Sequence, residues 1–169
     1  MGDGWRLAVR SDHADDEDAI IGFMSLEIAF DYRQFCWFQP LIGDYIDLQM
    51  GTADLKQPLP ISRCRRALWI PTIMWGGPIR FRLLVDVEES RAGAELGPHD
   101  RREAAFPLHS EGTPYGLMDI NGSSVILTEL LAEGDYHAVV LRAGINPAHV
   151  GDMRKHSKEQ YWLLLTTLH

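Results

Sequence analysis

The clearest pattern along the chain is strict alternation between residues 25 and 33. One parity carries the large apolar side chains, and the other carries small or charged ones: Leu26, Ile28, Phe30 and Tyr32 alternate with Ser25, Glu27, Ala29, Asp31 and Arg33. This period of two predicts a strand with one buried face. From Phe35 to Phe38 bulky residues occupy both parities. The strand therefore either enters the core completely or changes phase at a bulge near Arg33-Gln34.

A second alternating segment, Ile79–Val87, follows the apolar segment Ala67–Trp75. The sequence Gly76-Gly77-Pro78 between them is typical of a turn. We therefore expect these two segments to form an antiparallel pair. Pro71 has no N–H to donate to a ladder, which predicts a sheet edge or a bulge at that position.

The C-terminal half contains further strand signals. Asn121-Gly122 predicts a hairpin between the apolar segments on either side of it. Gly134-Asp135 opens a predicted strand, Tyr136–Leu141. The segment Tyr161–Leu168 is apolar on both parities, so we expect it in the middle of a sheet.

Helical periodicity is scarce, and only Leu41–Met50 and Pro147–Lys158 fit short helices. About eight short strands with Gly and Pro between them predict a mainly all-β fold, an antiparallel β-sandwich with one or two short helices. Residues 1–24 are expected to form an acidic, mobile N-terminal segment and residues 25–169 a single β-sandwich domain. The charged segment Glu88–Gly97 is expected to be mobile as well.

Composition is consistent with one globular unit and narrows the class of partner. The chain has 169 residues, 46% of them hydrophobic, and its 16 Lys and Arg against 24 Asp and Glu give a formal charge of −8. That sign argues against a nucleic-acid partner, because phosphate binding depends on a surplus of basic side chains. A charged partner is expected to be basic. The sequence contains no apolar span or leader pattern typical of export, which predicts a cytoplasmic protein with no membrane partner.

No pattern of catalytic or metal-ligating residues emerges. The seven histidines form no HxH or HExxH spacing, although His99 and His109 flank a predicted strand and could approach each other or a carboxylate. Cys36 and Cys64 are too few for a disulfide framework and are expected to be reduced, largely buried thiols. Nucleophile-elbow and phosphate-loop motifs do not occur. We therefore expect no enzyme activity, no cofactor and no metal.

The candidate partner-binding residues fall into two groups. An acidic run near the N-terminus could attract a cationic partner, and it comprises Asp12, Asp15, Asp16, Glu17 and Asp18. Trp75 lies beside a predicted turn, and Tyr32 and Arg33 end the first alternating segment. Because binding hot spots are enriched in Trp, Tyr and Arg, these three are candidate anchors.

Several segments, in order, resemble the competence protein ComJ family, which includes an inhibitor of the DNA-entry nuclease NucA. The residues that carry the resemblance are Phe30-Asp31-Tyr32-Arg33-Gln34-Phe35-Cys36-Trp37-Phe38-Gln39, Ala105-Phe106-Pro107-Leu108, Leu130-Leu131-Ala132-Glu133-Gly134-Asp135-Tyr136 and Tyr161–Leu168. The likeness extends from Ser25 to the last residue. The chain departs from the family in its acidic N-terminal segment and in a longer tract around Pro147–Lys158.

The resemblance implies a non-enzymatic protein that binds a nuclease and occludes its basic DNA-binding groove. This agrees with the independent expectation of a basic protein partner. Two other hypotheses remain open at this point: a sandwich that binds a small molecule, and an enzyme with His99 or His109 beside carboxylates, with or without a metal.

Overall fold

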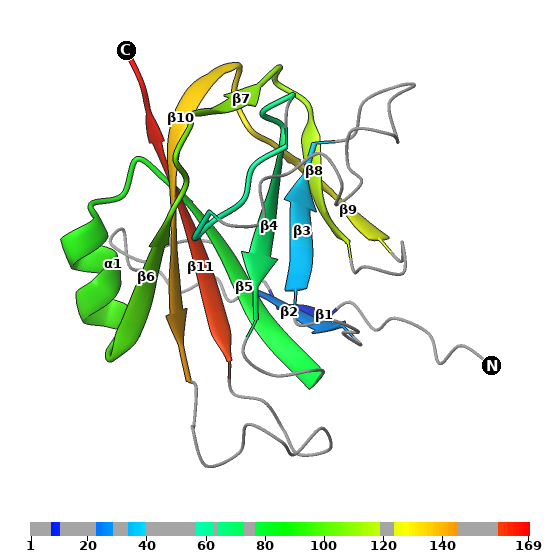
Figure 1. Cartoon of the computed structure of the whole chain (residues 1–169). Coiled ribbons are helices and arrows are strands. Elements are labelled where there is room, and N and C mark those ends of the chain that lie inside the picture. The colour runs from blue at the N-terminus through cyan, green and yellow to red at the C-terminus, as the bar shows by residue number, and fades with distance from the viewer. Residues whose placement is uncertain are drawn as a thin grey trace.

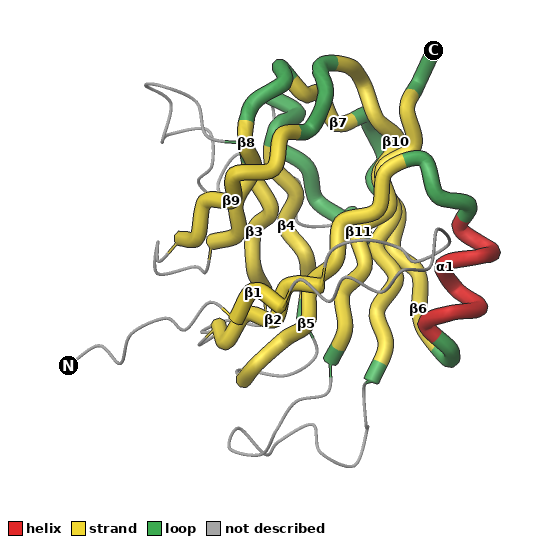
Figure 2. Tube along the Cα trace, turned by 180° about the vertical axis from the view of Figure 1, so that it is seen from behind, coloured by secondary structure: helices red, strands yellow, loops and turns green. Residues whose placement is uncertain are grey.

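In the described part of the chain, two β-sheets face each other and one helix packs against the larger sheet (Figures 1 and 2). The computed structural model describes residues 8–10, 23–28, 34–39, 57–62, 64–72, 77–118, 124–144 and 159–169. The larger sheet, called sheet A here, has the order β1-β2-β5-β11-β10-β6, and β7 also pairs with β10. Its strands are β1 (Ala8–Arg10), β2 (Phe23–Ile28), β5 (Gly77–Val85), β6 (His99–Glu103), β7 (Leu108–Ser110), β10 (Gly134–Ala143) and β11 (Gln160–Thr167).

The smaller sheet, sheet B, has the order β4-β3-β8-β9. Its strands are β3 (Gln34–Phe38), β4 (Ala67–Pro71), β8 (Pro114–Met118) and β9 (Ser124–Leu130). Pro71 is the last residue of β4, at the edge of the sheet, as its missing N–H predicts.

Aromatic side chains from both sheets meet in the core. Phe35 of β3 makes edge-to-face contacts with Phe81 of β5 and Tyr161 of β11, at centroid distances of 6.0 and 5.3 Å. Trp37 packs beside Tyr115 at 5.6 Å. Such ring pairs add to the free energy gained by burying apolar area, and here they fill the centre of the sandwich. The all-β sandwich predicted from periodicity is therefore confirmed.

The segment Glu88–Gly97, expected to be mobile, is instead the helix α1 (Glu89–Leu96). Gly97 ends the helix at φ 83°, where its N–H donates to the carbonyl of Gly93. Ala92 is buried against apolar side chains of three strands, Leu84, Val139, Leu141, Trp162 and Leu164. The sequence did not predict this helix, which packs on sheet A through the buried Ala92 and the partly buried Leu96.

The strand signals of the C-terminal half are confirmed. β8 and β9 pair antiparallel on either side of Asn121-Gly122, and β10 begins at Gly134. β11 lies between β5 and β10, in the middle of sheet A, and its buried residues occupy both parities. A strand with neighbours on both sides and packing on both faces needs this composition.

One predicted pairing was wrong, and one strand pair differs in direction from the antiparallel arrangement expected. Ala67–Trp75 and Ile79–Val87 do not form an antiparallel pair, because β4 belongs to sheet B and β5 to sheet A. The sandwich is also not purely antiparallel, because β11 runs parallel to β5. Of the strands on either side of Arg33, β2 belongs to sheet A and β3, which begins at Gln34, belongs to sheet B, so they are not one continuous strand.

The expected helices at Leu41–Met50 and Pro147–Lys158 lie outside the described residues. Of the segment 1–24, the structure describes β1 and the start of β2, which pair antiparallel. Within the described part of the chain, no helix is long and apolar enough to cross a membrane.

Candidate functional site

All eight candidate partner-binding residues fall outside the described parts of the chain. They are Asp12, Asp15, Asp16, Glu17, Asp18, Tyr32, Arg33 and Trp75. The structure nevertheless fixes the strand ends to which their segments are attached. The strand ends that carry the five acidic residues lie apart from those that carry Tyr32, Arg33 and Trp75.

The acidic run belongs to the connection between β1 and β2. Arg10 and Phe23, the residues at its two ends, are direct partners in the antiparallel pair. The connection carries five Asp or Glu and no Lys or Arg between these two points. Its charge is therefore anchored at the end of β2 where Phe23 lies.

The three candidate anchors are attached at the opposite end of β2. Tyr32 and Arg33 lie between Ile28 and Gln34, and Trp75 lies between Pro71 and Gly77. Ile28 pairs with Gly77, and Gln34 pairs with Pro71. The connection from β2 to β3 and the connection from β4 to β5 therefore start and end beside each other. Each runs between the Ile28–Gly77 pair of sheet A and the Gln34–Pro71 pair of sheet B. At about 3.4 Å per residue, the six residues of β2 separate the two groups of attachment points by about 17 Å.

The net charge of the protein is confined to the first third of its sequence. Residues 1–54 contain eleven Asp or Glu and three Arg, whereas residues 55–169 contain thirteen acidic and thirteen basic residues. The formal charge of −8 therefore belongs entirely to the part that forms β1, β2, β3 and their connections. The remainder is neutral.

Within that neutral remainder, opposite charges lie next to each other. Three arginines link different elements: Arg82 binds Glu95, Arg101 binds Glu89 and Glu103, and Arg142 binds Asp100. Arg101 also holds the pKa of the Glu103 carboxyl below its usual range, chiefly by donating a hydrogen bond to it. These pairs leave little uncompensated charge over α1, β6 and β10.

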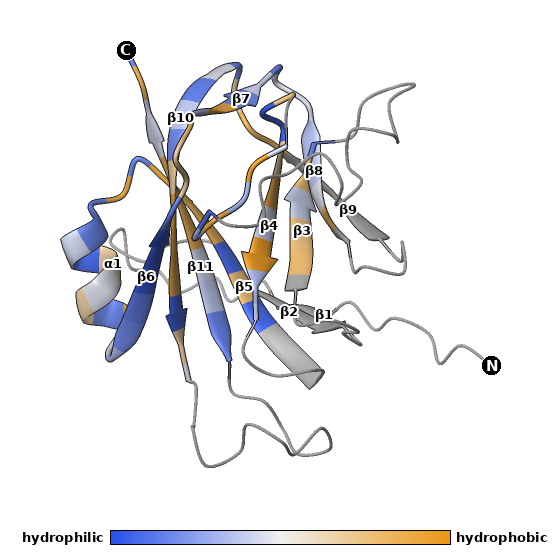
Figure 3. Cartoon of the chain, in the orientation of Figure 1, coloured by the Kyte–Doolittle hydropathy of each residue, from blue (hydrophilic) through white to orange (hydrophobic). Residues whose placement is uncertain are grey.

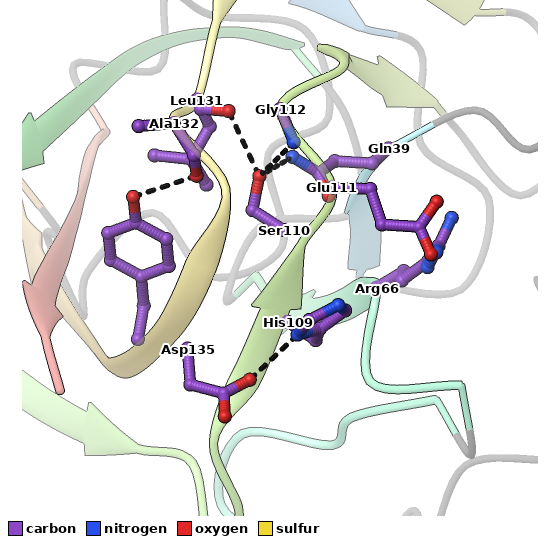
Figure 4. Close-up of polar contacts among 10 residues, drawn as sticks. Gln39, Arg66, His109, Ser110, Glu111, Gly112, Leu131, Ala132 and Asp135 are labelled. Atoms are coloured by element: carbon purple, nitrogen blue, oxygen red, sulfur yellow. Dashed lines mark hydrogen bonds and ion pairs between the residues drawn. The ribbon is translucent and has the colours of Figure 1, made fainter. Parts of the chain in front are cut away.

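A set of polar contacts closes the end of the sandwich where β7 lies (Figure 4). The Ser110 hydroxyl is fully buried, accepts a hydrogen bond from the Gln39 amide at 2.8 Å and donates to the Leu131 carbonyl at 3.0 Å. Arg66 pairs with Glu111 at the same end. Ser110 thus joins sheet B to the connection that leads into β10, and its hydroxyl is used in structural hydrogen bonds.

The histidines singled out in the sequence occupy separate places. His109 Nδ1 lies 2.8 Å from Asp135 Oδ1, so His109 does approach a carboxylate. His99 Nδ1 lies 2.6 Å from the Gly97 carbonyl, at the end of α1. Among the described residues, no three His, Cys, Asp or Glu side chains are placed to hold a metal ion.

The two cysteines are free, with Cys36 buried and Cys64 half-buried. Burial raises the pKa of the Cys36 thiol far above its usual range, and the nearby Cys64 adds to the rise. A thiol that stays protonated is a poor nucleophile. Cys36 therefore acts as a small apolar residue beside Phe38 and Trp69.

Two exposed apolar side chains were not predicted from the sequence. Phe106 is 58% exposed in the connection from β6 to β7, and Leu130 is 65% exposed at the end of β9. The Pro that follows Phe106 was a signal for irregular backbone at this position.

Comparison with known proteins gives one informative match. No family model matches the sequence, and no curated protein matches it. Among solved structures, the crystal structure of ComJ from Bacillus subtilis, described as an inhibitor of the DNA degrading activity of NucA, matches with a TM-score of 0.51. The match covers 96% of this chain and 99% of that chain at 15% sequence identity. The chain has a ComJ-like fold.

The segments that resembled the ComJ family in sequence are distributed over both sheets of this ComJ-like fold. Phe35 and Phe38 lie in β3 of sheet B, whereas Leu108, Tyr136 and Tyr161 lie in sheet A. All five are buried. The segments that carry the resemblance in sequence therefore contribute to the core of both sheets, although Phe106 and Leu130 within them are exposed.

Proposed function

We propose that this protein binds a nuclease and inhibits it, with no catalytic step of its own. The observation that carries the proposal is the ComJ-like fold, which extends over almost the whole of both chains. The solved protein with that fold is described as an inhibitor of a DNA-degrading activity. Because the two chains share 15% identity, the particular nuclease is left open.

The distribution of charge supports this function independently. A nuclease binds DNA through a basic groove, and a protein that carries acidic side chains can occupy such a groove. Here the whole formal charge of −8 lies in residues 1–54, and residues 55–169 are neutral. We therefore assign the acidic run from Asp12 to Asp18 to the attraction of the nuclease.

The two groups of candidate residues have different roles in this proposal. The acidic run accelerates encounter, because long-range attraction acts mainly on the association rate. Tyr32, Arg33 and Trp75 provide short-range contacts that slow dissociation. An interface of ordinary size buries about 800 Å² on each partner, enough to include both ends of β2.

The direct test is to pass lysate of the host cell over the immobilised protein and to assay DNA degradation in the flow-through and in the eluate. We expect the protein to remove a DNA-degrading activity from the lysate. The captured nuclease should lose that activity again when free protein is added in equimolar amount. A lysate that keeps its full activity, or a captured nuclease that stays active, would contradict the proposal.

A second experiment separates the two roles by binding kinetics with the captured nuclease. The variant Asp15→Asn/Asp16→Asn should associate more slowly at low salt and show a weaker dependence on salt, with the dissociation rate unchanged. Its matched control is Glu88→Gln/Glu133→Gln, which removes two exposed charges from the neutral part. Equal effects of both variants would show that the position of the acidic run is irrelevant.

The anchors are tested by the dissociation rate. Trp75→Ala should dissociate at least about tenfold faster, because truncation of a central aromatic anchor commonly costs about 2 kcal/mol or more. Leu130→Ala, at another exposed apolar side chain, is the control. Unchanged dissociation of the Trp75→Ala variant would remove Trp75 from the interface.

A further inference from the structure

The edge strand β6 has one unpaired side. On one side it pairs with β10, from Glu103 opposite Val139 to His99 opposite Ala143. On its other side, none of the strands that the structure describes pairs with it. The N–H of Ala104 donates to the Ala138 carbonyl. Since alternate residues of an antiparallel strand bond to the same neighbour, the main-chain groups of His99, Arg101 and Glu103 point to the open side.

The five residues of β6, His-Asp-Arg-Arg-Glu, are all charged or titratable (Figure 3). Charged side chains normally protect an edge strand from pairing with other chains. This sequence, however, is complementary to itself when two copies run antiparallel about Arg101. His99 then faces Glu103 of the second copy, and Asp100 faces Arg102. The Asp100–Arg102 pair brings opposite charges together, and the His99–Glu103 pair brings an imidazole to a carboxylate. Each pair occurs twice.

We infer that β6 pairs with β6 of a second copy of this chain, so that sheet A continues across a symmetric dimer. The same surface is used by both copies, as a twofold axis requires. The centre of the pairing is Arg101, whose main-chain N–H and C=O face the open side. The outward main-chain groups of His99, Arg101 and Glu103 bond to those of Glu103, Arg101 and His99 in the second copy.

The charges select this register over its neighbours. The two registers that also keep the outward main-chain groups paired place Asp100 opposite Asp100 or Arg102 opposite Arg102, and like charges directly opposite are unfavourable. In the proposed register the only like pair is Arg101 with itself. Each Arg101 is already neutralised by Glu89 and Glu103, at 2.5 and 2.6 Å. Of the three registers, the one centred on Arg101 therefore has the least repulsion between like charges.

An apolar contact is available at each end of the paired strands. Phe106 is 58% exposed and lies three residues beyond the end of β6, in the connection to β7. In the antiparallel pair it comes beside the chain that leads into β6 of the second copy, where Pro98 is exposed. Burial of the Phe106 side chain of each copy would add apolar area to an interface that is otherwise polar.

The first test is sedimentation velocity of the full chain from low to high micromolar concentration. We expect a species of 19.1 kDa to give way to one of twice that mass as the concentration rises. Arg102→Glu turns two attractive pairs into repulsive ones, so the dissociation constant of the dimer should rise about tenfold or more. Phe106→Ser should weaken the dimer as well.

The matched control is Arg80→Glu, which makes the same change of charge at an exposed arginine of β5, inside sheet A. It should leave the dimer unchanged. A protein that stays monomeric at every concentration would overturn the inference. So would a dimer that Arg102→Glu and Arg80→Glu affect equally.

Hydrogen exchange locates the interface. As the dimer forms, the amides of Arg101 and Glu103 should become slower to exchange, whereas those of Asp100 and Arg102, which already face β10, should not change. A dimer in which the Arg101 and Glu103 amides exchange at the monomer rate uses another surface, and the inference fails. These measurements contain no nuclease, so their outcome is independent of the proposed inhibition.

Discussion

Arg142 joins the two sheets through a single buried side chain. It lies on β10 with 3% of its side chain exposed, and its Nε donates to Asp100 at 2.6 Å. Its Nη1 donates to the carbonyl of Pro71 on β4 at 2.9 Å. A guanidinium in this position is tolerated only while its carboxylate partner is present.

Removal of that partner should therefore destabilise the fold. Asp100→Ala should lower the free energy of unfolding by about 1–3 kcal/mol, because Arg142 would be left buried without its carboxylate. Adding Arg142→Met should cost less than the sum of the two single changes, since the buried charge is then gone as well. The measurement is urea unfolding of both single variants and the double variant. Strict additivity would contradict the coupling.

Asp86 gives a prediction about acid stability. Its carboxylate accepts hydrogen bonds from the N–H and the hydroxyl of Thr167, both at 2.7 Å, and these lower its pKa, the N–H most strongly. A lowered pKa in the folded state means that the stabilisation is complete above the unfolded value of about 3.9 and is lost as the pH falls through the folded value.

Asp86→Asn should therefore be less stable than the parent chain at neutral pH, and the difference should shrink once the pH falls below about 3.9. Urea unfolding across this pH range measures it. Thr167→Val is the control, because it removes the hydroxyl and keeps the N–H. It should show a smaller difference at neutral pH. A difference that does not depend on pH would contradict the assignment.

Individual contacts of this kind were only partly accessible from the sequence. The sequence indicated that His109 could approach a carboxylate, and the partner is Asp135, 26 residues away in the chain. Nothing in local spacing identifies a partner at that separation. The pairing of Arg142 with Asp100 was not predicted for the same reason, because it depends on the register between β6 and β10.

At the scale of elements, a period of two was a dependable signal, whereas turn motifs were dependable only in part. The hairpin predicted at Asn121-Gly122 is confirmed, and the one predicted at Gly76-Gly77-Pro78 is not. Alternation located the strands around Ser25 and Ile79, and Gly134-Asp135 located the start of β10. Gly77 and Pro78 of the predicted turn are instead the first residues of β5, where they pair with Ile28 and Glu27 of β2. A turn motif does not encode whether the next strand returns to the same sheet or crosses to the opposite one, and here it crosses.

The helix α1 was missed because its amphipathic pattern is weak. Ala92 is its only fully buried residue, and Gly93 interrupts it. The helix is held from outside its own sequence by apolar side chains of sheet A and by Arg82, which binds Glu95 and lies 4.8 Å from the ring centroid of Trp162. Tertiary contacts of this kind commonly override weak intrinsic propensity.

Ala92→Glu should detach the helix from sheet A, because it places a charge against Leu141 and Trp162. We expect faster amide exchange throughout Glu89–Leu96, with β10 and β11 still protected. Ser90→Glu, an equal change at an exposed position of the same helix, should leave exchange as it is. Equal acceleration in both variants would mean that burial of Ala92 does not seat the helix.

At the scale of the whole molecule, a sandwich was predictable and its connectivity was not. Composition and turn spacing favoured two packed sheets. The order β2-β5-β11-β10 brings together strands from the beginning, middle and end of the chain. The eight predicted site residues share a related difficulty, because their attachment to opposite ends of β2 follows from register and from nothing in their own segments.

This topology predicts slow folding. Pairs such as β5 with β11 and β6 with β10 close long loops before they gain contacts, so refolding should take on the order of milliseconds to seconds. Stopped-flow fluorescence can follow it, since Trp37, Trp69 and Trp162 are buried. A main phase in the microsecond range would contradict this expectation.

The position of β11 links assembly of the fold to translation. It follows every other described strand in the chain, yet it separates β5 from β10 in sheet A. While a nascent chain is still attached to the ribosome short of Gln160, the edges of β5 and β10 have no common neighbour. Sheet A is therefore completed only when this late-emerging strand is inserted, and premature termination before it would leave two incomplete fragments of sheet.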